Sequence, residues 1–239
     1  MIYFSQVYIL KMNIVDWYND EVIKIWKTFY IKNNLQYVPS VLQYFKTNIE
    51  ILFVGFNPSY DEKWHAKQFE KHNELKNSNF NSKNLFDWQG DLKGDQLNTL
   101  KEHEKRHIEH PYFKQFDNVS SNHHWEHIDL FLFRETNQEN GIKKIMKDKS
   151  EDELNDFGKA QIDLFKNLLL KVKPKLIVLC NAKVSHIISK YFFPSKIQPT
   201  SIDVWDENLK IIYASMLTGQ RSMDIYSRER LKEQILKEL

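Results

Sequence analysis

The chain has 239 residues, enough for one domain with a substantial hydrophobic core. Its net charge of +2 and its single cysteine exclude a disulfide framework, a thiolate metal cluster and binding of nucleic acid through charge alone. No run of 18 apolar residues and no secretory leader pattern occurs, so we expect a cytoplasmic protein that does not insert into membranes.

The N-terminal part of the chain favours helices. Apolar residues at helical spacing predict a helix from Asp16 to about residue 33, with Asp16 as its N-cap. A second, short helix is expected over about residues 40–46. We interpret residues 1–47 as a helical extension of a single domain that spans residues 1–239. The apolar run that follows, over residues 50–56, predicts a buried strand.

A polar insertion rich in Asn, Lys and His follows over about residues 60–124, with possible helices at 64–76 and 95–109. It contains a His-Glu-x-x-His sequence at residues 103–107, a pattern typical of zinc hydrolases. Because the flanking residues are polar all round, we predict a solvated helix without a metal. The other histidines nearby are expected on the surface: His123, His124 and His127.

The remainder of the chain alternates strands with helices. A strand is predicted over residues 125–133, and Ser150 with Glu153 forms a capping box for a helix that runs to about residue 172. The later elements are a strand at 175–180, a helix at 182–192, strands at 201–205 and 209–215, and a helix from about 227. This alternation predicts an α/β fold, a three-layer α/β/α sandwich around a mainly parallel sheet of four to five strands.

Three polar segments each end a predicted strand, at residues 55–59, 129–136 and 215–221. Because the carboxyl ends of parallel strands share one edge of a sheet, we expect these segments to line one cleft. Gly55 and Pro58 would hold Asn57 at that edge on rigid supports.

The motif Gly55-Phe56-Asn57-Pro58 resembles a turn of the uracil-DNA glycosylase superfamily, in the version found in mismatch-specific and thymine-DNA glycosylases. Residues 216–221 look like the last functional loop of those enzymes, and residues 173–182 are similar to a core strand and its helix. The resemblance spans about residues 48–238. It implies an enzyme of base-excision DNA repair that hydrolyses the N-glycosidic bond of a flipped uracil or other modified or damaged pyrimidine.

The resemblance also implies roles for residues. Asn57 would be catalytic and hold the attacking water. The residues that would bind the base are Phe56, Tyr112, Phe113 and Asp129. Those that would contact DNA are Ser59, Thr218, Gly219, Gln220 and Arg221. Because an aspartate accepts hydrogen bonds, Asp129 would favour an exocyclic amine, which makes a modified cytosine a possible substrate. The enzyme would act on DNA as a monomer, without a metal or cofactor.

Two other functions fit the sequence. The histidine common in the last loop of the superfamily is absent, and Met216 and Leu217 stand in its neighbourhood. In the first alternative, which this absence suggests, the chain is a nucleic-acid-binding module of the same fold whose site has lost its catalytic activity. Alternatively, the same layered fold serves a small-molecule hydrolase.

Overall fold

The computed structural model describes residues 13–45, 48–148, 150, 152–195, 201–219 and 222–239. Its five-stranded sheet has the order β2-β1-β3-β5-β4. The strands are β1 (Ile51–Gly55), β2 (Trp125–Asp129), β3 (Leu176–Leu179), β4 (Ile202–Trp205) and β5 (Leu209–Tyr213). Only β4 runs antiparallel to its neighbour. The predicted α/β class with a mainly parallel sheet is confirmed.

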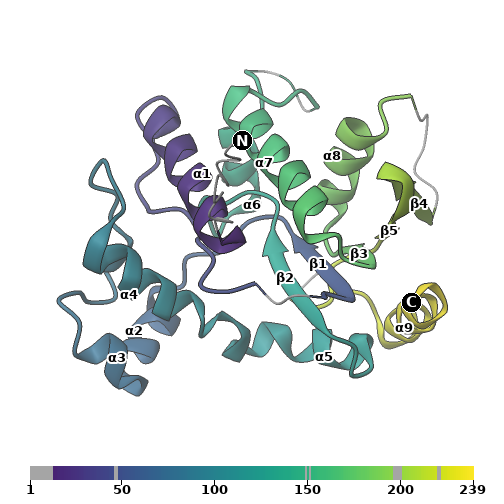
Figure 1. Ribbon diagram of the computed structural model, residues 1–239, viewed down its shortest axis with the longest axis horizontal. Helices are drawn as coiled ribbons and strands as arrows, with labels where there is room; N and C mark the ends of the chain where they lie inside the picture. The colour runs from purple at the N-terminus through teal and green to yellow at the C-terminus, as the bar shows by residue number, and fades with distance from the viewer. Residues whose placement is uncertain (1–12, 46–47, 149, 151, 196–200, 220–221) are drawn as a thin grey trace, which may run out of the picture.

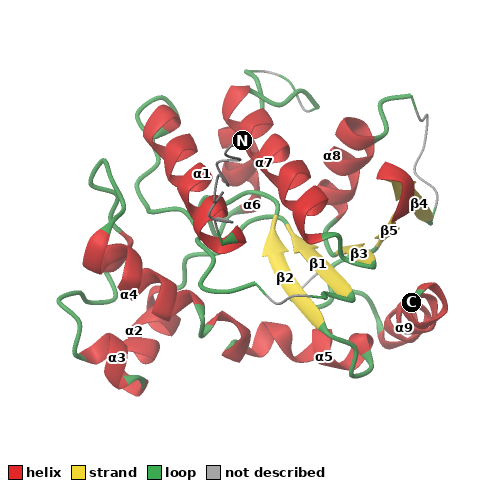
Figure 2. Ribbon diagram, viewed as in Figure 1, coloured by secondary structure: helices red, strands yellow, loops and turns green. Residues whose placement is uncertain are grey.

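Helices cover both faces of the sheet (Figures 1 and 2). One face carries α1 (Ile14–Phe29), α6 (Gln138–Ile145), α7 (Asp156–Val172) and α8 (Ala182–Phe192). The other carries α5 (Lys114–Ser120) and α9 (Ile225–Glu238). The insertion adds α2 (Glu62–Lys71), α3 (Asn73–Lys76) and α4 (Gly94–Glu104), which lie beside the sheet. None of the helices in the described part of the chain has the length and apolar character needed to span a membrane.

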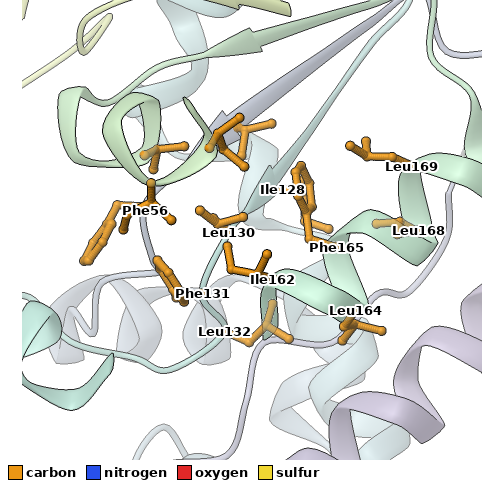
Figure 3. Close-up of a cluster of buried hydrophobic side chains, with 14 of the residues drawn as sticks. Phe56, Ile128, Leu130, Phe131, Leu132, Ile162, Leu164, Phe165, Leu168 and Leu169 are labelled. Atoms are coloured by element: carbon orange, nitrogen blue, oxygen red, sulfur yellow. The ribbon is translucent and has the colours of Figure 1, made fainter. Parts of the chain in front are cut away.

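The alternating side chains of β1 divide the core into two layers. Leu52 and Val54 pack with α1, α7 and α8, whereas Ile51 and Phe53 pack with α5 and α9. Figure 3 shows part of the first layer, where Ile162 and Phe165 of α7 face Ile128 of β2. Because β1 is buried on both faces, its sequence is a continuous apolar run.

The N-terminal predictions need two corrections. The N-cap of α1 is Asn13, whose Oδ1 accepts a hydrogen bond from the Val15 N–H at 3.1 Å, so the assignment of Asp16 was wrong. Residues 40–45 form no helix, and residues 46–47 lie outside the described residues. The backbone of this segment has tertiary partners instead, because the Ser40 N–H donates to the Leu132 carbonyl and the Leu42 N–H donates to Asn19.

Several predicted elements begin or end at residues other than those expected. The strand after the insertion stops at Asp129 rather than at residue 133. Helix α7 begins after Asn155, whose Oδ1 caps it, so the capping box of Ser150 with Glu153 was wrong as the start of this helix. Asn155 also donates to the carbonyls of Lys144 and Met146, which ties the start of α7 to the end of α6. Helix α9 starts after Asp224 rather than at residue 227.

Gly55 stands opposite Asp129 in the ladder of β1 and β2. A Cβ atom on Gly55 would lie 2.1 Å from Asp129 Oδ1 and 2.9 Å from His127 Nε2. The carboxylate of Asp129 therefore occupies the space that any side chain at position 55 would need.

Gly55→Ala is expected to lower the free energy of unfolding by about 1–3 kcal/mol, because the added methyl group forces β2 away from β1. Denaturant unfolding of the full chain measures this. The same substitution in an Asp129→Ala background should cost clearly less, since the nearest obstacle is gone. An equal loss of stability in both backgrounds would show that the methyl group at position 55 does not clash with Asp129.

Candidate functional site

The carboxyl ends of β1 and β2 open into a pocket of about 300 Å³. All three segments that the sequence analysis placed at this edge contribute, through Asn57, Arg134 and Met216. The insertion forms much of the remaining wall. Of the predicted site residues, those that line the pocket are Phe56, Asn57, Ser59, Tyr112, Phe113 and Asp129.

The predicted DNA contacts in the last loop lie differently. Thr218 and Gly219 are not among the residues that line the pocket, although Thr218 lies near the hydroxyl of Tyr112. Gly219 has a φ of +91°, a left-handed conformation that favours glycine. Gln220 and Arg221 lie outside the described residues.

Asn57 is held by three backbone carbonyls. Its Nδ2 donates to the carbonyl oxygens of Glu135 at 2.7 Å, Pro58 at 3.0 Å and Phe133 at 3.2 Å. Because carbonyl oxygens only accept hydrogen bonds, this orientation of the amide is the one that satisfies them. No described residue donates to Oδ1 of Asn57. The side chain therefore offers the pocket one acceptor atom in a fixed position.

Asp129 carries a largely buried carboxyl group at the end of β2, with its side chain 11% exposed, and no described residue gives it a hydrogen bond. Burial, with a smaller contribution from the nearby Glu104, raises its pKa to about 7, although Arg134 opposes the change. Near neutral pH the carboxyl group is thus present in both forms. It can accept a hydrogen bond when ionised and donate one when protonated.

The structure overturns the prediction of a surface position for His127, whereas His124 is exposed as predicted and His123 is partly exposed. Other histidines of the insertion are also buried or partly buried. His103 is only 2% exposed, and its Nε2 lies 3.0 Å from Nδ1 of His65. The side chain of His127 is 5% exposed. Burial lowers the pKa of His65 and of His107 to about 3 each, and it holds the pKa values of His103 and His127 well below the usual range. These imidazoles are therefore neutral at pH 7.

The residues of the His-Glu-x-x-His sequence separate in space because α4 ends at Glu104. His103 meets His65, Glu104 forms an ion pair with Arg134, and His107 lies in a short 3-10 turn (His107–Glu109) beside His127. The two histidines of the sequence thus do not share one helical face, as a zinc hydrolase requires. The helix is not solvated as we expected, since it packs its last turn into the pocket.

Arg134 and Glu104 form a buried ion pair in the pocket wall. The guanidinium group also lies 4.8 Å from the centre of the Phe86 ring. This pair was not predicted from the sequence. The one indication of Arg134 in the sequence is a charged residue directly after the apolar run 130–133. Its partner lies 30 residues away in the insertion, so local sequence cannot identify it.

The predicted aromatic residues differ in exposure. Phe56 and Phe113 are buried in the walls, where Phe56 packs edge-on against Phe131 and Phe113 packs against His107. Tyr112 is only partly buried and remains the best placed of the predicted rings to stack on a ligand. Burial raises the pKa of its hydroxyl, which stays protonated and can donate a hydrogen bond.

Comparison of the chain with models of known protein families gives no match, and comparison with curated proteins gives none either. The assignment of a function therefore depends on the chemistry of the pocket.

Glu104→Gln is expected to lower the free energy of unfolding by about 3–5 kcal/mol, because it leaves the buried guanidinium group of Arg134 without a charged partner. Denaturant unfolding measures the loss. The matched control is Glu21→Gln, which removes an exposed ion pair with Lys24 and should change the stability little, because solvent screens this pair. Similar costs for the two variants would show that the pocket pair is solvated.

Proposed function

We propose that this protein is a monofunctional DNA glycosylase that hydrolyses the N-glycosidic bond of a flipped uracil or other modified or damaged pyrimidine, modified cytosines included. The observation that carries the proposal is the Asn57 amide. Three carbonyls orient it at the carboxyl edge of the mainly parallel sheet, and no residue that the structure describes donates a hydrogen bond to its oxygen. The proposal includes action on DNA as a cytoplasmic monomer.

The size of the pocket supports a small, flat ligand. Its volume of about 300 Å³ is at the lower end of the range for small-molecule sites, which suits a single base with part of its sugar. A base within a duplex cannot enter such a recess unless it leaves the stack. Tyr112 can stack on the extruded base, and the carboxyl group of Asp129 can meet its polar edge.

Asn57 would act by positioning. Its Oδ1 accepts a hydrogen bond from a water molecule and directs the oxygen of that water at the anomeric carbon of the sugar. The C–N bond then breaks and the bonding pair leaves with the base. As the new C–O bond forms, the water gives up one proton, which the departing base takes up, so the products are the neutral base and the abasic sugar. Because an amide is a weak base, the rate enhancement comes from orientation and from a good leaving group.

Asp129 suits either class of pyrimidine. In its ionised form it accepts a hydrogen bond from the exocyclic amine of a cytosine, and in its protonated form it donates to a carbonyl oxygen of a uracil. Its raised pKa, about 7, keeps both forms available. Discrimination between bases would then depend on this carboxyl group more than on the apolar walls.

The test uses duplex oligonucleotides, each with one modified pyrimidine, followed by alkali cleavage of any abasic strand. Asn57→Ala is expected to reduce the rate by about 10²-fold or more, because the water loses its orientation. The control is Asn118→Ala, which changes an exposed asparagine on α5 and should leave the rate unchanged. No product across a broad panel contradicts the proposal, and DNA binding without turnover would indicate a binding module instead.

A further inference from the structure

One cluster in the pocket has no part in the positioning of water by Asn57. His107, His127 and Asp129 each offer one ligand atom, and these atoms lie within 4.8 Å of one another. His127 Nε2 and Asp129 Oδ1 are 3.9 Å apart. These residues were not grouped from the sequence, because 20 positions separate His107 from His127 and two different elements carry them.

The backbone holds the three groups together. His127 and Asp129 are two positions apart along β2, so their side chains lie on the same side of the strand. Both ligand atoms approach Gly55, where the absence of a Cβ leaves room for them. His107 comes from the insertion, and the centre of its ring is 5.7 Å from that of His127. Phe113 packs against both imidazoles, with ring centres 4.5 Å from His107 and 4.9 Å from His127.

Two groups of this cluster, in His127 and Asp129, lack hydrogen-bond partners among the described residues. Nε2 of His127 is buried without a hydrogen bond. The side chain of Asp129 is 11% exposed, and its carboxyl group receives no hydrogen bond from a described residue, which is costly for a largely buried carboxylate. Buried polar atoms in native proteins are nearly always satisfied, so each unpaired atom needs an explanation. A single cation between the three groups would satisfy both of these atoms at once.

We propose that His107, His127 and Asp129 bind one divalent transition-metal ion, with Zn²⁺ as the expected occupant. Two neutral imidazoles and one carboxylate form the kind of three-residue ligand set that holds catalytic zinc and leaves one coordination position open. Mg²⁺ and Ca²⁺ prefer ligands that are all oxygen, so they fit this set poorly. Phe113, which packs against both imidazoles, would help to fix the orientation of the two histidine ligands.

The geometry requires only a small adjustment. Zn²⁺ lies about 2.0–2.2 Å from nitrogen and oxygen ligands, so tetrahedral ligand atoms are about 3.3 Å apart. The separation of 3.9 Å between His127 and Asp129 is close to this value. His107 is carried by a short turn rather than a long helix, which makes the remaining approach easy.

The inference does not depend on the proposed glycosylase activity, because Asn57 is not one of the ligands. The ion would nevertheless lie in the same pocket, with its open position available to water or to an oxygen of the substrate. In the metal-bound protein, Asp129 would meet the substrate through the ion. Metal binding and base excision can be measured separately, so either proposal can fail alone.

The test is calorimetric titration of the full chain with ZnCl₂ after treatment with a chelator, with MgCl₂ as the comparison ion. We expect one equivalent of Zn²⁺ per chain. Asp129→Asn and His107→Gln should each weaken binding at least about tenfold. The matched control is His110→Gln, which changes a histidine that lines the same pocket outside the cluster and should bind Zn²⁺ as the wild type does. Asn57→Ala should also bind normally.

Two further measurements guard against variants that merely misfold. Circular dichroism shows whether each variant is folded, and Zn²⁺ should raise the Tm of the wild type but not that of Asp129→Asn. Co²⁺ bound to the wild type should give d–d absorption bands of a low-coordinate site, which Asp129→Asn should lose. Absence of stoichiometric binding, or equal affinity in folded His107→Gln and wild type, would overturn the proposal and indicate that water bridges the cluster.

Discussion

The close approach of Gly55 to Asp129 is the constraint on which the pocket depends. Parallel pairing of β1 with β2 sets these residues opposite each other, and the missing side chain of Gly55 lets a carboxyl group lie against the neighbouring strand. Asp129 is thereby buried at the carboxyl edge of the sheet, where ligands of α/β proteins bind. A larger residue at position 55 would displace both Asp129 and His127, which are polar residues of the pocket lining.

The insertion between β1 and β2 turns this edge into an enclosed site. Its helix α4 ends in the pocket wall, where Glu104 pairs with Arg134 from the loop that follows β2. The pair ties the insertion to the sheet, because separating two buried charges is costly. The enclosure also keeps the imidazoles of His103 and His107 neutral.

The pocket thus holds two polar centres of different character. Asn57 is fully oriented by backbone carbonyls and has one acceptor left over, which suits a group that positions water. The ligand atoms of His107, His127 and Asp129 lie close together, and Nε2 of His127 has no hydrogen-bond partner among the described residues. Such a cluster is suited to binding a ligand. The two centres line the same pocket.

Local sequence was sufficient for the sheet and for the position of Asn57. The apolar runs of β1 and β3 and the periodicity of α8 depend on burial and on backbone preferences that act over a few residues. The pairing of Glu104 with Arg134, the burial of His127 and the non-helical course of residues 40–45 depend instead on partners far away in the chain. These contacts exist only after the insertion has packed against the sheet, because local patterns carry no information about which distant group will satisfy a buried charge or a free N–H.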